Sequence, residues 1–414
     1  MGIYDISVIG GGPAGCMAAI TAARLGKKVI LIEKNAEIGK KILITGKGRC
    51  NISNSAPVGA FIEKFGARGR FLKTAVYNFS SADLVEFFGS AGLELKTERQ
   101  GRIFPSSDKA GSVTAALKKL LADAGVEIMY NSRAAGINRG TNCLVVKLSG
   151  GAAVCSKNVI LCAGGASFKA TGSTGDGYEM AARLGHTVMP LEPGLVPLRT
   201  EEKFVVQLQG IALKNVRISF GSGKKMLVSP IGELMFTHFG ISGPLVLDLS
   251  GAVVKMAEET VVVPARIDFK PGLTPEQIDR RLLKDIKEKC NIDTGNLMKS
   301  FLPHRLVPVF LQAASVSAGK KSNQITAEER SSIRDFLKSF PLTVAGPLAL
   351  EEGMVTDGGI STAEINPRTM ESKLVHGLFF AGEIIDGRAP SGGYNIQQAF
   401  STGRLAGESA AKNI

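Results

Sequence analysis

The chain lacks the residue patterns that mark metal-binding and disulfide-rich proteins. Its 414 residues include no tryptophan, and its six cysteines never occur as Cys-x-x-Cys. This spacing argues against a zinc site, an iron–sulfur cluster and a disulfide framework. The four histidines are far apart and form no His-Glu-x-x-His pattern. We therefore predict no protein metal site, and we expect most cysteines to be small core residues.

Long apolar runs and a leader-like start are missing as well. The apolar stretches are broken by Gly, Lys or Glu well before the roughly 18 residues that a membrane-spanning helix needs. The first residues lack the basic lead, apolar core and cleavage-like end of a signal peptide. With 44% hydrophobic residues, the chain has material for a large core in two or three domains. We expect a soluble, cytoplasmic protein with no membrane partner.

Most of the formal charge of +13 is spread thinly along the chain, but one stretch forms a local positive patch. Residues 40–73 carry eight basic side chains against a single acid, Glu63. The basic residues are Lys40, Lys41, Lys47, Arg49, Lys64, Arg68, Arg70 and Lys73. A solvated basic face and an anion-binding face are both consistent with this stretch. Because few aromatic residues are interleaved for stacking on bases, we do not expect a nucleic acid partner.

The order of strand-like and helical patterns predicts an α/β protein with an insertion. Residues 1–190 alternate the two patterns, and strand and glycine patterns return over 345–414. Short β-like pieces fill 191–272, and charged helical segments fill 273–344. We predict a Rossmann-like FAD-binding domain built from both chain ends, with an inserted β-rich domain and a small inserted helical domain.

The N-terminal stretch contains a dinucleotide-binding turn. Gly10, Gly12 and Gly15 fit Gly-x-Gly-x-x-Gly directly after a strand and at the start of a helix. The pattern provides a tight turn, close approach of the backbone to a pyrophosphate, and close packing of helix on strand. Pro13 suits the first helical position. Glu33 ends the next strand, where its carboxylate can accept hydrogen bonds from a ribose and would repel a 2′-phosphate. FAD or NAD fits this unit, and NADP does not.

The other end of the chain decides between FAD and NAD. FAD is too long for one strand–helix–strand unit and needs a second cradle for its ribityl chain and flavin. "GLFFAGEIID" is an apolar strand ending in Gly382-Glu383, and "SGGYNIQQAF" is a glycine turn leading into a final helix. A carboxylate at a strand end can bind ribityl hydroxyls, and helix N-terminal amides can stabilise negative charge at the flavin N1–C2=O locus. This pairing favours FAD.

Several stretches together resemble a single family. They are, in chain order, "GGGPAG", "GKKILITGKGRCNISN", "GRIFPSSDKA", "GSTGDGYEMAARLGH", "FTHFGISGPLVLDLS", "VTDGGIS", "TMESKLVHGLFFAGEIID" and "GGYNIQQAFSTG". They resemble the HI0933-like flavoproteins, also described as the BaiN/RdsA or aminoacetone-oxidase type of NAD(P)/FAD-dependent oxidoreductase. The resemblance spans almost the whole chain. It implies a FAD domain formed by both chain ends, with a β-rich and a helical domain inserted between them.

The resemblance also implies which residues contact FAD. They are Gly10, Gly12, Pro13, Ala14, Gly15, Glu33, Lys34, Lys41, Thr45, Gly48, Arg49, Cys50, Asn51, Ala163, Gly164, Gly165, Asp176, Gly177, Gly382, Glu383, Asp386, Gly393, Tyr394, Asn395 and Ile396. One segment departs from the pattern. Arg388-Ala389-Pro390 stands where relatives more often carry an acidic residue and a glycine, so the resemblance does not define the local flavin or substrate contact, although it still implies the cofactor.

The reaction is open among three classes. The leading hypothesis is a reductase that passes hydride from NAD(P)H through FAD to an unsaturated small molecule. A flavin oxidase of a small amine such as aminoacetone, using oxygen, is the alternative, and an RNA-directed flavoprotein is a third. The chain has no second Gly-x-Gly-x-x-Gly, so NAD(P)H would bind transiently. Without Cys-x-x-Cys, we do not expect a disulfide reductase of the thioredoxin reductase kind.

Three residues are candidates for catalysis. Arg102 can clamp a carboxylate or phosphate of an anionic substrate, or form a surface ion pair. His238 can transfer a proton near neutral pH, or act as a structural hydrogen-bonding residue. Tyr394 lies beside the flavin turn. Arg49 could lower the pKa of Cys50, although packing at the flavin edge is the simpler role for this thiol. The sequence leaves the substrate and the oligomeric state open.

Overall fold

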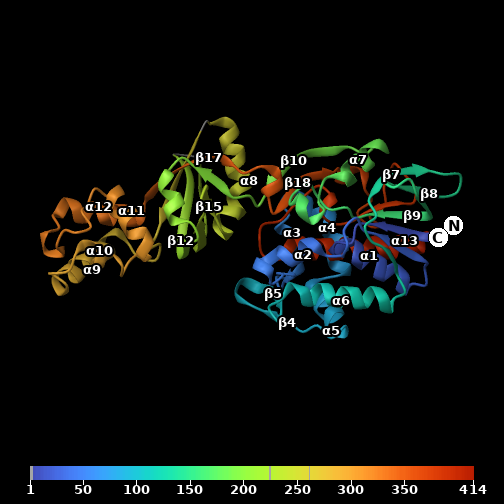
Figure 1. Ribbon diagram of the computed structural model, residues 1–414, viewed down its shortest axis with the longest axis horizontal. Coiled ribbons are helices and arrows are strands. Elements are labelled where there is room, and N and C mark those ends of the chain that lie inside the picture. Colours follow the sequence, from blue (N-terminus) through green and yellow to red (C-terminus); the bar gives the residue numbers. More distant parts are fainter. Residues whose placement is uncertain (1–2, 223–224, 261) are drawn as a thin grey trace. The chain divides into compact units, whose positions relative to one another are not determined.

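The computed structural model describes residues 3–222, 225–260 and 262–414. It confirms the predicted mixed α/β class. The chain forms two compact units: Met1–Gly194 with Leu350–Ile414 make up unit 1, and Leu195–Ala349 make up unit 2. Both chain ends, blue and red in Figure 1, therefore fold together in unit 1.

Within the described part of unit 1, the main sheet has seven strands. They are β1 (Tyr4–Ile9), β2 (Val29–Ile32), β6 (Glu127–Met129), β7 (Ala134–Arg139), β8 (Leu144–Leu148), β9 (Ala153–Leu161) and β19 (Leu378–Phe380). The first half of β9 pairs antiparallel with β8, and its second half pairs parallel with β19. Strands β6, β2, β1, β9 and β19 thus form a parallel core, because each runs parallel to its neighbour.

The parallel strands are apolar on both faces. All four residues of β2 are buried, as are Ile6 to Ile9 of β1 and Leu378 to Phe380 of β19. Parallel strands are covered by helices on both sides, so continuous Val, Ile and Leu runs are expected in them. The strand patterns that sequence analysis found around Gly10, Glu33 and Gly382 correspond to these buried strands.

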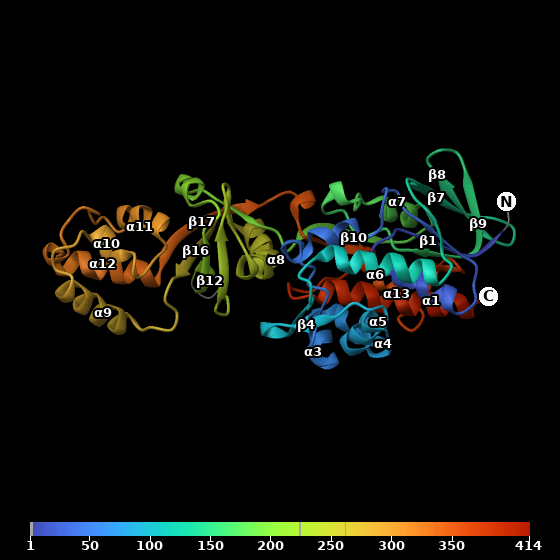
Figure 2. The same cartoon turned by 60° about the horizontal axis from the view of Figure 1, so that its bottom comes forward.

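Glycines let the helices from the two chain ends pack closely. Helix α1 (Pro13–Arg24) lies beside α13 (Tyr394–Lys412), blue against red in Figures 1 and 2. A Cβ atom on Gly403 would lie 2.3 Å from the carbonyl oxygen of Ala14, and one on Gly407 would lie 2.5 Å from that of Ala18. The absence of side chains at both glycines therefore allows the C-terminal helix to support the helix of the dinucleotide turn.

Further helices and two small sheets complete unit 1. The remaining helices are α2 (Lys40–Ile44), α3 (Val58–Glu63), α4 (Gly69–Asn78), α5 (Ser81–Ser90), α6 (Ala110–Asp123) and α7 (Asp176–Arg183). Strands β3 (Ser53–Asn54), β5 (Arg102–Pro105) and β4 (Leu95–Thr97) form one small sheet, and β10 (Val188–Gly194) pairs with β18 (Val355–Ile360) in the other. The pairing of β10 with β18 joins the chain segments that flank unit 2.

The described residues of unit 2 form an antiparallel sheet and five α-helices. The strands are β11 (Leu198–Thr200), β12 (Ala212–Ser222), β13 (Lys225–Val228), β14 (Gly232–Phe236), β15 (Gly240–Ser242), β16 (Val263–Asp268) and β17 (Phe340–Pro347). The helices are α8 (Pro244–Glu259), α9 (Pro275–Glu288), α10 (Thr294–Met298), α11 (Val307–Ala313) and α12 (Ala327–Lys338). Strand β16 pairs back with β12, so the sheet closes on itself.

The sheet and the helices of unit 2 share one hydrophobic core. Phe310 of α11 stacks on Phe340 of β17 with a ring-centroid distance of 6.1 Å, and Leu337 of α12 belongs to the same buried cluster. Strand β17 crosses the boundary at residue 344 that sequence analysis placed between the helical insertion and the FAD domain. The division of the insertion into a β-rich and a helical domain stays a prediction.

The described residues were also expected to contain neither a membrane-spanning helix nor a metal site. Among residues 3–222, 225–260 and 262–414, no helix combines the length and apolar character needed to cross a bilayer. In the same part of the chain, His, Cys, Asp and Glu side chains nowhere gather in threes in a way that could hold a metal ion. Of the cysteines, Cys16, Cys50 and Cys162 are buried, while Cys290 is exposed.

His186 is a buried histidine of unit 1, and its surroundings predict that stability depends on pH. The His186 side chain is inaccessible to solvent; its Nε2 lies 2.8 Å from Ser372 Oγ, and its Nδ1 lies 3.2 Å from Glu364 Oε2 but outside hydrogen-bonding geometry. Burial lowers the pKa of His186. The nearby Glu364 raises the same pKa, but the effect of burial is larger, so the pKa lies below its ordinary value. Hydrogen bonds from Thr187 lower the pKa of Glu364 despite its burial.

Both shifts predict a loss of stability in acid. A histidine whose pKa is lowered by folding stabilises the native state above its unfolded pKa of about 6.5, and this contribution is lost as the pH falls below that value. We expect the melting temperature to fall between about pH 7 and pH 5, and His186→Gln to weaken this pH dependence. Calorimetry at a series of pH values tests this. An equal pH slope in variant and wild type would exclude the histidine as its source.

Candidate functional site

A deep pocket in unit 1 lies at the carboxyl ends of the parallel strands. The residues that directly follow β1, β2 and β9 line it, together with Gly382 and Glu383 just beyond β19. The edge of a parallel sheet at its carboxyl ends is where open α/β folds bind ligands. The N-termini of α1 and α13 both border this pocket, so residues of both chain ends line one site.

The glycines of the dinucleotide turn have the predicted mechanical roles. Gly10 has a φ of 103°, and a Cβ atom there would lie 2.4 Å from the Cys162 carbonyl oxygen. A Cβ atom on Gly15 would lie 1.8 Å from the carbonyl oxygen of Gly10, so this glycine permits close packing of helix on strand. Gly12 precedes α1 and has open space on its side-chain side. A phosphate group can therefore approach the backbone at Gly12 and the N-terminus of α1.

Glu33 is buried at the end of β2 and is held in place by backbone and side-chain donors. Its Oε2 accepts a hydrogen bond from the Gly11 amide at 2.6 Å. Its Oε1 accepts two from Asn35, from the amide nitrogen and from Nδ2, each at 2.7 Å. A carboxylate has about four acceptor positions, so these three bonds orient Glu33 and leave capacity for a ligand hydroxyl.

Two cations and one acid line the pocket beyond Glu33. Asp176, at the start of α7, binds Lys34 Nζ at 3.0 Å and Arg133 Nη2 at 2.8 Å. Burial raises the pKa of Asp176, but hydrogen bonds from Arg133 and Lys34 outweigh it and hold the pKa below its ordinary value. Lys34 and Arg133 are thereby fixed near Glu33, where the adenosine half of a dinucleotide is expected.

The opposite part of the pocket contains an ion pair between the two chain ends. Both Glu383 oxygens accept hydrogen bonds from Lys41 Nζ, at 2.9 and 3.0 Å. Glu383 Oε1 also accepts from the Thr356 amide, and Lys41 also donates to Ser167 Oγ. Lys41 and Glu383 are about one-fifth exposed and line the pocket. The glutamate that sequence analysis assigned to the ribityl chain therefore lies on the pocket wall with a fixed orientation.

The charges of the pocket suit a dinucleotide. Five basic and three acidic residues line it, an excess of two positive charges. The basic residues are Lys34, Lys40, Lys41, Arg133 and Arg388, and the acidic ones are Glu33, Asp176 and Glu383. Arg388 is paired with Asp357, which lies outside the lining, and the remaining positive excess suits the negatively charged pyrophosphate, which the α1 N-terminus also stabilises. The residues present therefore fit FAD.

Most predicted FAD residues line this pocket. Those that do are Gly10, Gly12, Pro13, Ala14, Glu33, Lys34, Lys41, Thr45, Ala163, Gly164, Asp176, Gly382, Glu383, Asn395 and Ile396. The other predicted residues lie outside its lining and are Gly15, Gly48, Arg49, Cys50, Asn51, Gly165, Gly177, Asp386, Gly393 and Tyr394. Gly393 and Asn51 adjoin one another before α13, because a Cβ atom on Gly393 would lie 2.9 Å from Asn51 Oδ1. All of these FAD contacts stay predictions.

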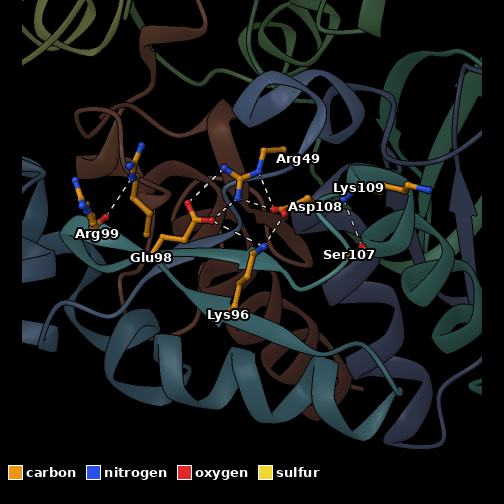
Figure 3. Close-up of polar contacts among 8 residues, drawn as sticks. Arg49, Lys96, Glu98, Arg99, Ser107, Asp108 and Lys109 are labelled. Carbon is orange, nitrogen blue, oxygen red and sulfur yellow. Dashed lines mark hydrogen bonds and ion pairs between the residues drawn. The ribbon is translucent and has the colours of Figure 1, made fainter. Parts of the chain in front are cut away.

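Arg49 points into a surface network of charges. Figure 3 shows its guanidinium group directed at Glu98 and Asp108, with Lys96 approaching the same two carboxylates. Arg49 also lies over the Phe104 ring, 4.1 Å from its centroid. Hydrogen bonds from Arg49 lower the pKa of Glu98, and those from Lys96 and Arg49 lower that of Asp108. The network links Arg49, which follows α2, to Glu98 and Asp108.

None of the three catalytic candidates lines the pocket. Arg102 donates from Nε to the Arg99 carbonyl at 3.2 Å and makes no ion pair with any described residue. Tyr394 is buried against Phe61, with a centroid distance of 5.1 Å. His238 is exposed in unit 2, between β14 and β15, beside Phe239. Their catalytic roles stay predictions.

Cys50 is a buried thiol. Burial raises its pKa to about 12, and a hydrogen bond with Thr45 lowers the pKa only in part. Arg49 directs its charge to Glu98 and Asp108 instead. The hypothesis that Arg49 lowers the pKa of Cys50 is therefore wrong, because burial disfavours the thiolate.

Sequence reasoning missed several pocket residues. Asn35, Arg133, Met354 and Thr356 line the pocket but were not among the predicted contacts. Asn35 lies two residues after Glu33, so a turn at the end of β2 would have predicted that its side chain is close to the Glu33 carboxylate. Arg133 and Met354 stand in no motif, and only the folding of distant segments places them here.

The basic stretch divides into paired and unpaired residues. Lys41, Arg49 and Arg68 form ion pairs with Glu383, Glu98 and Asp386, respectively. The remaining basic residues are Lys40, Lys47, Lys64, Arg70 and Lys73, which are exposed and form no ion pair with any described residue. An exposed set of basic side chains on α2 to α4 therefore stays available to an anionic partner.

Fold and site together define a flavin-dependent oxidoreductase with a Rossmann-type FAD-binding domain. The family model described as HI0933-like protein Rossmann domain matches residues 4–409. The chain belongs to this family, as its sequence motifs indicated, and is a FAD-dependent oxidoreductase.

Two relatives match over nearly their whole length. One is a 3-dehydro-bile acid delta(4,6)-reductase of Clostridium scindens, 32% identical over 98% of this chain and 99% of the relative. The other is a ribosomal RNA dihydrouridine synthase of Haemophilus influenzae, 31% identical over 95% of both chains. The chain is similar to both.

Solved structures show the same fold. A 3-ketosteroid delta1-dehydrogenase of Sterolibacterium denitrificans matches with a TM-score of 0.56 and 14% identity, over 100% of both chains. A flavocytochrome c3 fumarate reductase matches with a TM-score of 0.54 and 19% identity, over 99% of this chain and 78% of the other. At this identity the likeness concerns the fold.

Proposed function

We propose that this protein reduces a carbon–carbon double bond conjugated to a carbonyl group, with NAD(P)H as the reductant. The observation that carries the proposal is the two-ended pocket, whose charges and glycine turn fit FAD. The names of the two relatives support the type of reaction. A bile acid delta(4,6)-reductase reduces ring double bonds, and dihydrouridine is uridine whose ring double bond is reduced.

The reaction balances as a hydride and a proton added across the double bond. NAD(P)H is oxidised to NAD(P)⁺, the carbon β to the carbonyl receives the hydride, and the α carbon receives a proton from solvent. Bound FAD supplies the hydride transfer between the two substrates. The transient binding of NAD(P)H and the identity of the acceptor belong to the proposal.

Residues of the chain would hold the cofactor in four places. Glu33 would bind the adenosine ribose, and the backbone at Gly12 with the α1 N-terminus would bind the pyrophosphate. Glu383, fixed by Lys41 and the Thr356 amide, would bind ribityl hydroxyls. The amides at Asn395 and Ile396, at the N-terminus of α13, would stabilise negative charge on the flavin.

Anaerobic half-reactions test the proposal. We expect the purified protein to be yellow, NADH or NADPH to bleach the flavin absorbance, and an enone to restore it. 2-Cyclohexen-1-one, 4-androstene-3,17-dione and uridine are suitable acceptors. Failure of both nicotinamides to bleach the flavin would contradict the reductase. Bleaching by aminoacetone with reoxidation only by oxygen would favour the amine oxidase.

A second candidate is the reduction of a base in RNA. It is supported by the name of the H. influenzae relative and by the exposed basic residues of α2 to α4. Binding to ribosomal RNA fragments at several salt concentrations would test it. Phosphate contacts by Lys47, Lys64, Arg70 and Lys73 predict an affinity that falls steeply with salt. Weak binding without that dependence would leave a small molecule as the substrate.

A further inference from the structure

Arg388 presents unused hydrogen-bond donors to the pocket. Its Nε donates to Asp357 Oδ2 at 3.0 Å, and its Nη groups donate to no described residue. The side chain is 16% exposed and lines the pocket together with Met354, Val355 and Gly387. None of these neighbours belongs to the residues that the family resemblance assigns to FAD. Arg388 therefore lies in a part of the pocket that the resemblance does not assign to FAD.

Interactions on both sides of Arg388 hold it in place. Asn395 forms two hydrogen bonds with the backbone of Ala389, accepting from its nitrogen and donating to its oxygen, both at 2.9 Å. Arg68 binds the buried Asp386 at 2.6 Å. The Arg388 chain also packs over Gly194, where a Cβ atom would lie 2.5 Å from its Cδ. A side chain held in this way is preorganised to bind a ligand.

The surrounding charges decide what ligand suits Arg388. Its positive charge is balanced by Asp357, just as Lys41 is balanced by Glu383 and Arg68 by Asp386. With no local excess charge, the site favours a neutral acceptor of hydrogen bonds over a permanent anion. A carbonyl oxygen is such an acceptor, and it gains negative charge when the β carbon of an enone receives a hydride.

We propose that Arg388 binds the carbonyl oxygen of the substrate through its Nη donors, so that the substrate class is a neutral enone or ring amide. This rests on the proposed function and names the specificity-determining residue of its site. In the balanced reaction, Arg388 neither gains nor loses a proton. It stabilises the negative charge that develops on the carbonyl oxygen, and Asp357 positions the guanidinium group.

The test compares Arg388→Gln and Arg388→Lys with Arg183→Gln, a control at an exposed arginine on α7. Loss of one donor to a developing oxyanion costs roughly 100-fold in rate, so Arg388→Gln should slow reoxidation by 2-cyclohexen-1-one or 4-androstene-3,17-dione to that extent. The reoxidation rate of Arg388→Lys should lie between those of the wild type and Arg388→Gln, because lysine keeps the positive charge but lacks the paired donors of the guanidinium group. FAD affinity, flavin reduction potential and reoxidation by ferricyanide should stay unchanged in all three variants.

A binding measurement separates this inference from the proposed function. Titration of the oxidised holoenzyme with each enone, followed by the flavin difference spectrum, should show weaker binding in Arg388→Gln than in the control. If the wild type binds an enone through Arg388 but does not reduce it, the proposed function fails and the binding role stands. Equal binding and rates in Arg388→Gln and control would overturn the inference. A shifted reduction potential with slower ferricyanide reoxidation would also overturn it and place Arg388 on the cofactor.

Discussion

Replacing Gly403 by valine is expected to destabilise unit 1 by about 3 kcal/mol. The Cβ atom alone would lie 2.3 Å from the Ala14 carbonyl oxygen, so α13 must move away from α1. The obstructing atom belongs to the backbone of the helix that follows the dinucleotide turn, and it cannot rotate away as a side chain does. We expect the temperature of flavin release to fall by roughly 10 °C, with weaker FAD binding.

Gly89→Ala is the matched control for this substitution. Gly89 also lies in a helix, but a Cβ atom there meets no atom within 4 Å. Alanine is the better helix former, so this variant should be unchanged or stabilised by up to about 1 kcal/mol. If Gly403→Val melts like the wild type, close packing of α1 on α13 does not hold the two chain ends together.

Replacing Glu33 by alanine is expected to weaken FAD binding by about 100-fold. A hydrogen bond to a charged group contributes about 1.5–3 kcal/mol, so loss of one or two bonds to ribose hydroxyls gives an effect of this size. The variant also removes the acceptor of the Gly11 and Asn35 amides, which orients the turn. Fluorescence titration of the apoprotein with FAD measures the dissociation constant.

Glu37→Ala provides the comparison, because Glu37 lies four residues away, is about half exposed and pairs only with Lys118 among the described residues. FAD affinity in this variant should match the wild type. A similar affinity in Glu33→Ala would show that Glu33 has a purely structural role at the end of β2. Circular dichroism of both variants would establish that they are folded.

The dinucleotide half of the site was predictable because it depends on local chemistry. Gly10, Gly12 and Gly15 are needed by a single strand–turn–helix unit, and Glu33 follows the next strand of that unit. The cradle around Gly382 and Glu383 was predictable for the same reason, since a strand end and a helix start are both local features. Because FAD is too long for either half alone, the two halves were expected to line one pocket, and they do so in unit 1.

The remaining pocket residues depend on contacts that no local pattern encodes. Arg133 reaches the pocket because Asp176, more than 40 positions later, binds it. Asp357 and Arg388 meet across 31 positions, and a glycine at 194 leaves space for the arginine chain. Arg49, which the family resemblance places at FAD, is directed at Glu98 and Asp108, two residues more than 45 positions away, and its contact with FAD stays a prediction.

The sequence by itself determined the class of fold, the FAD-binding turn and the two chain ends that build the cofactor site. The fold class and the turn follow from residue spacing within units of about 30 positions, the length of one strand–helix–strand unit, and the joining of the two chain ends follows from the length of FAD. Only the tertiary structure decided which charges balance one another in the pocket and which arginine is left with free donors. The direction of a side chain depends on the partners that the fold brings to it, and those partners come from segments far apart in the chain.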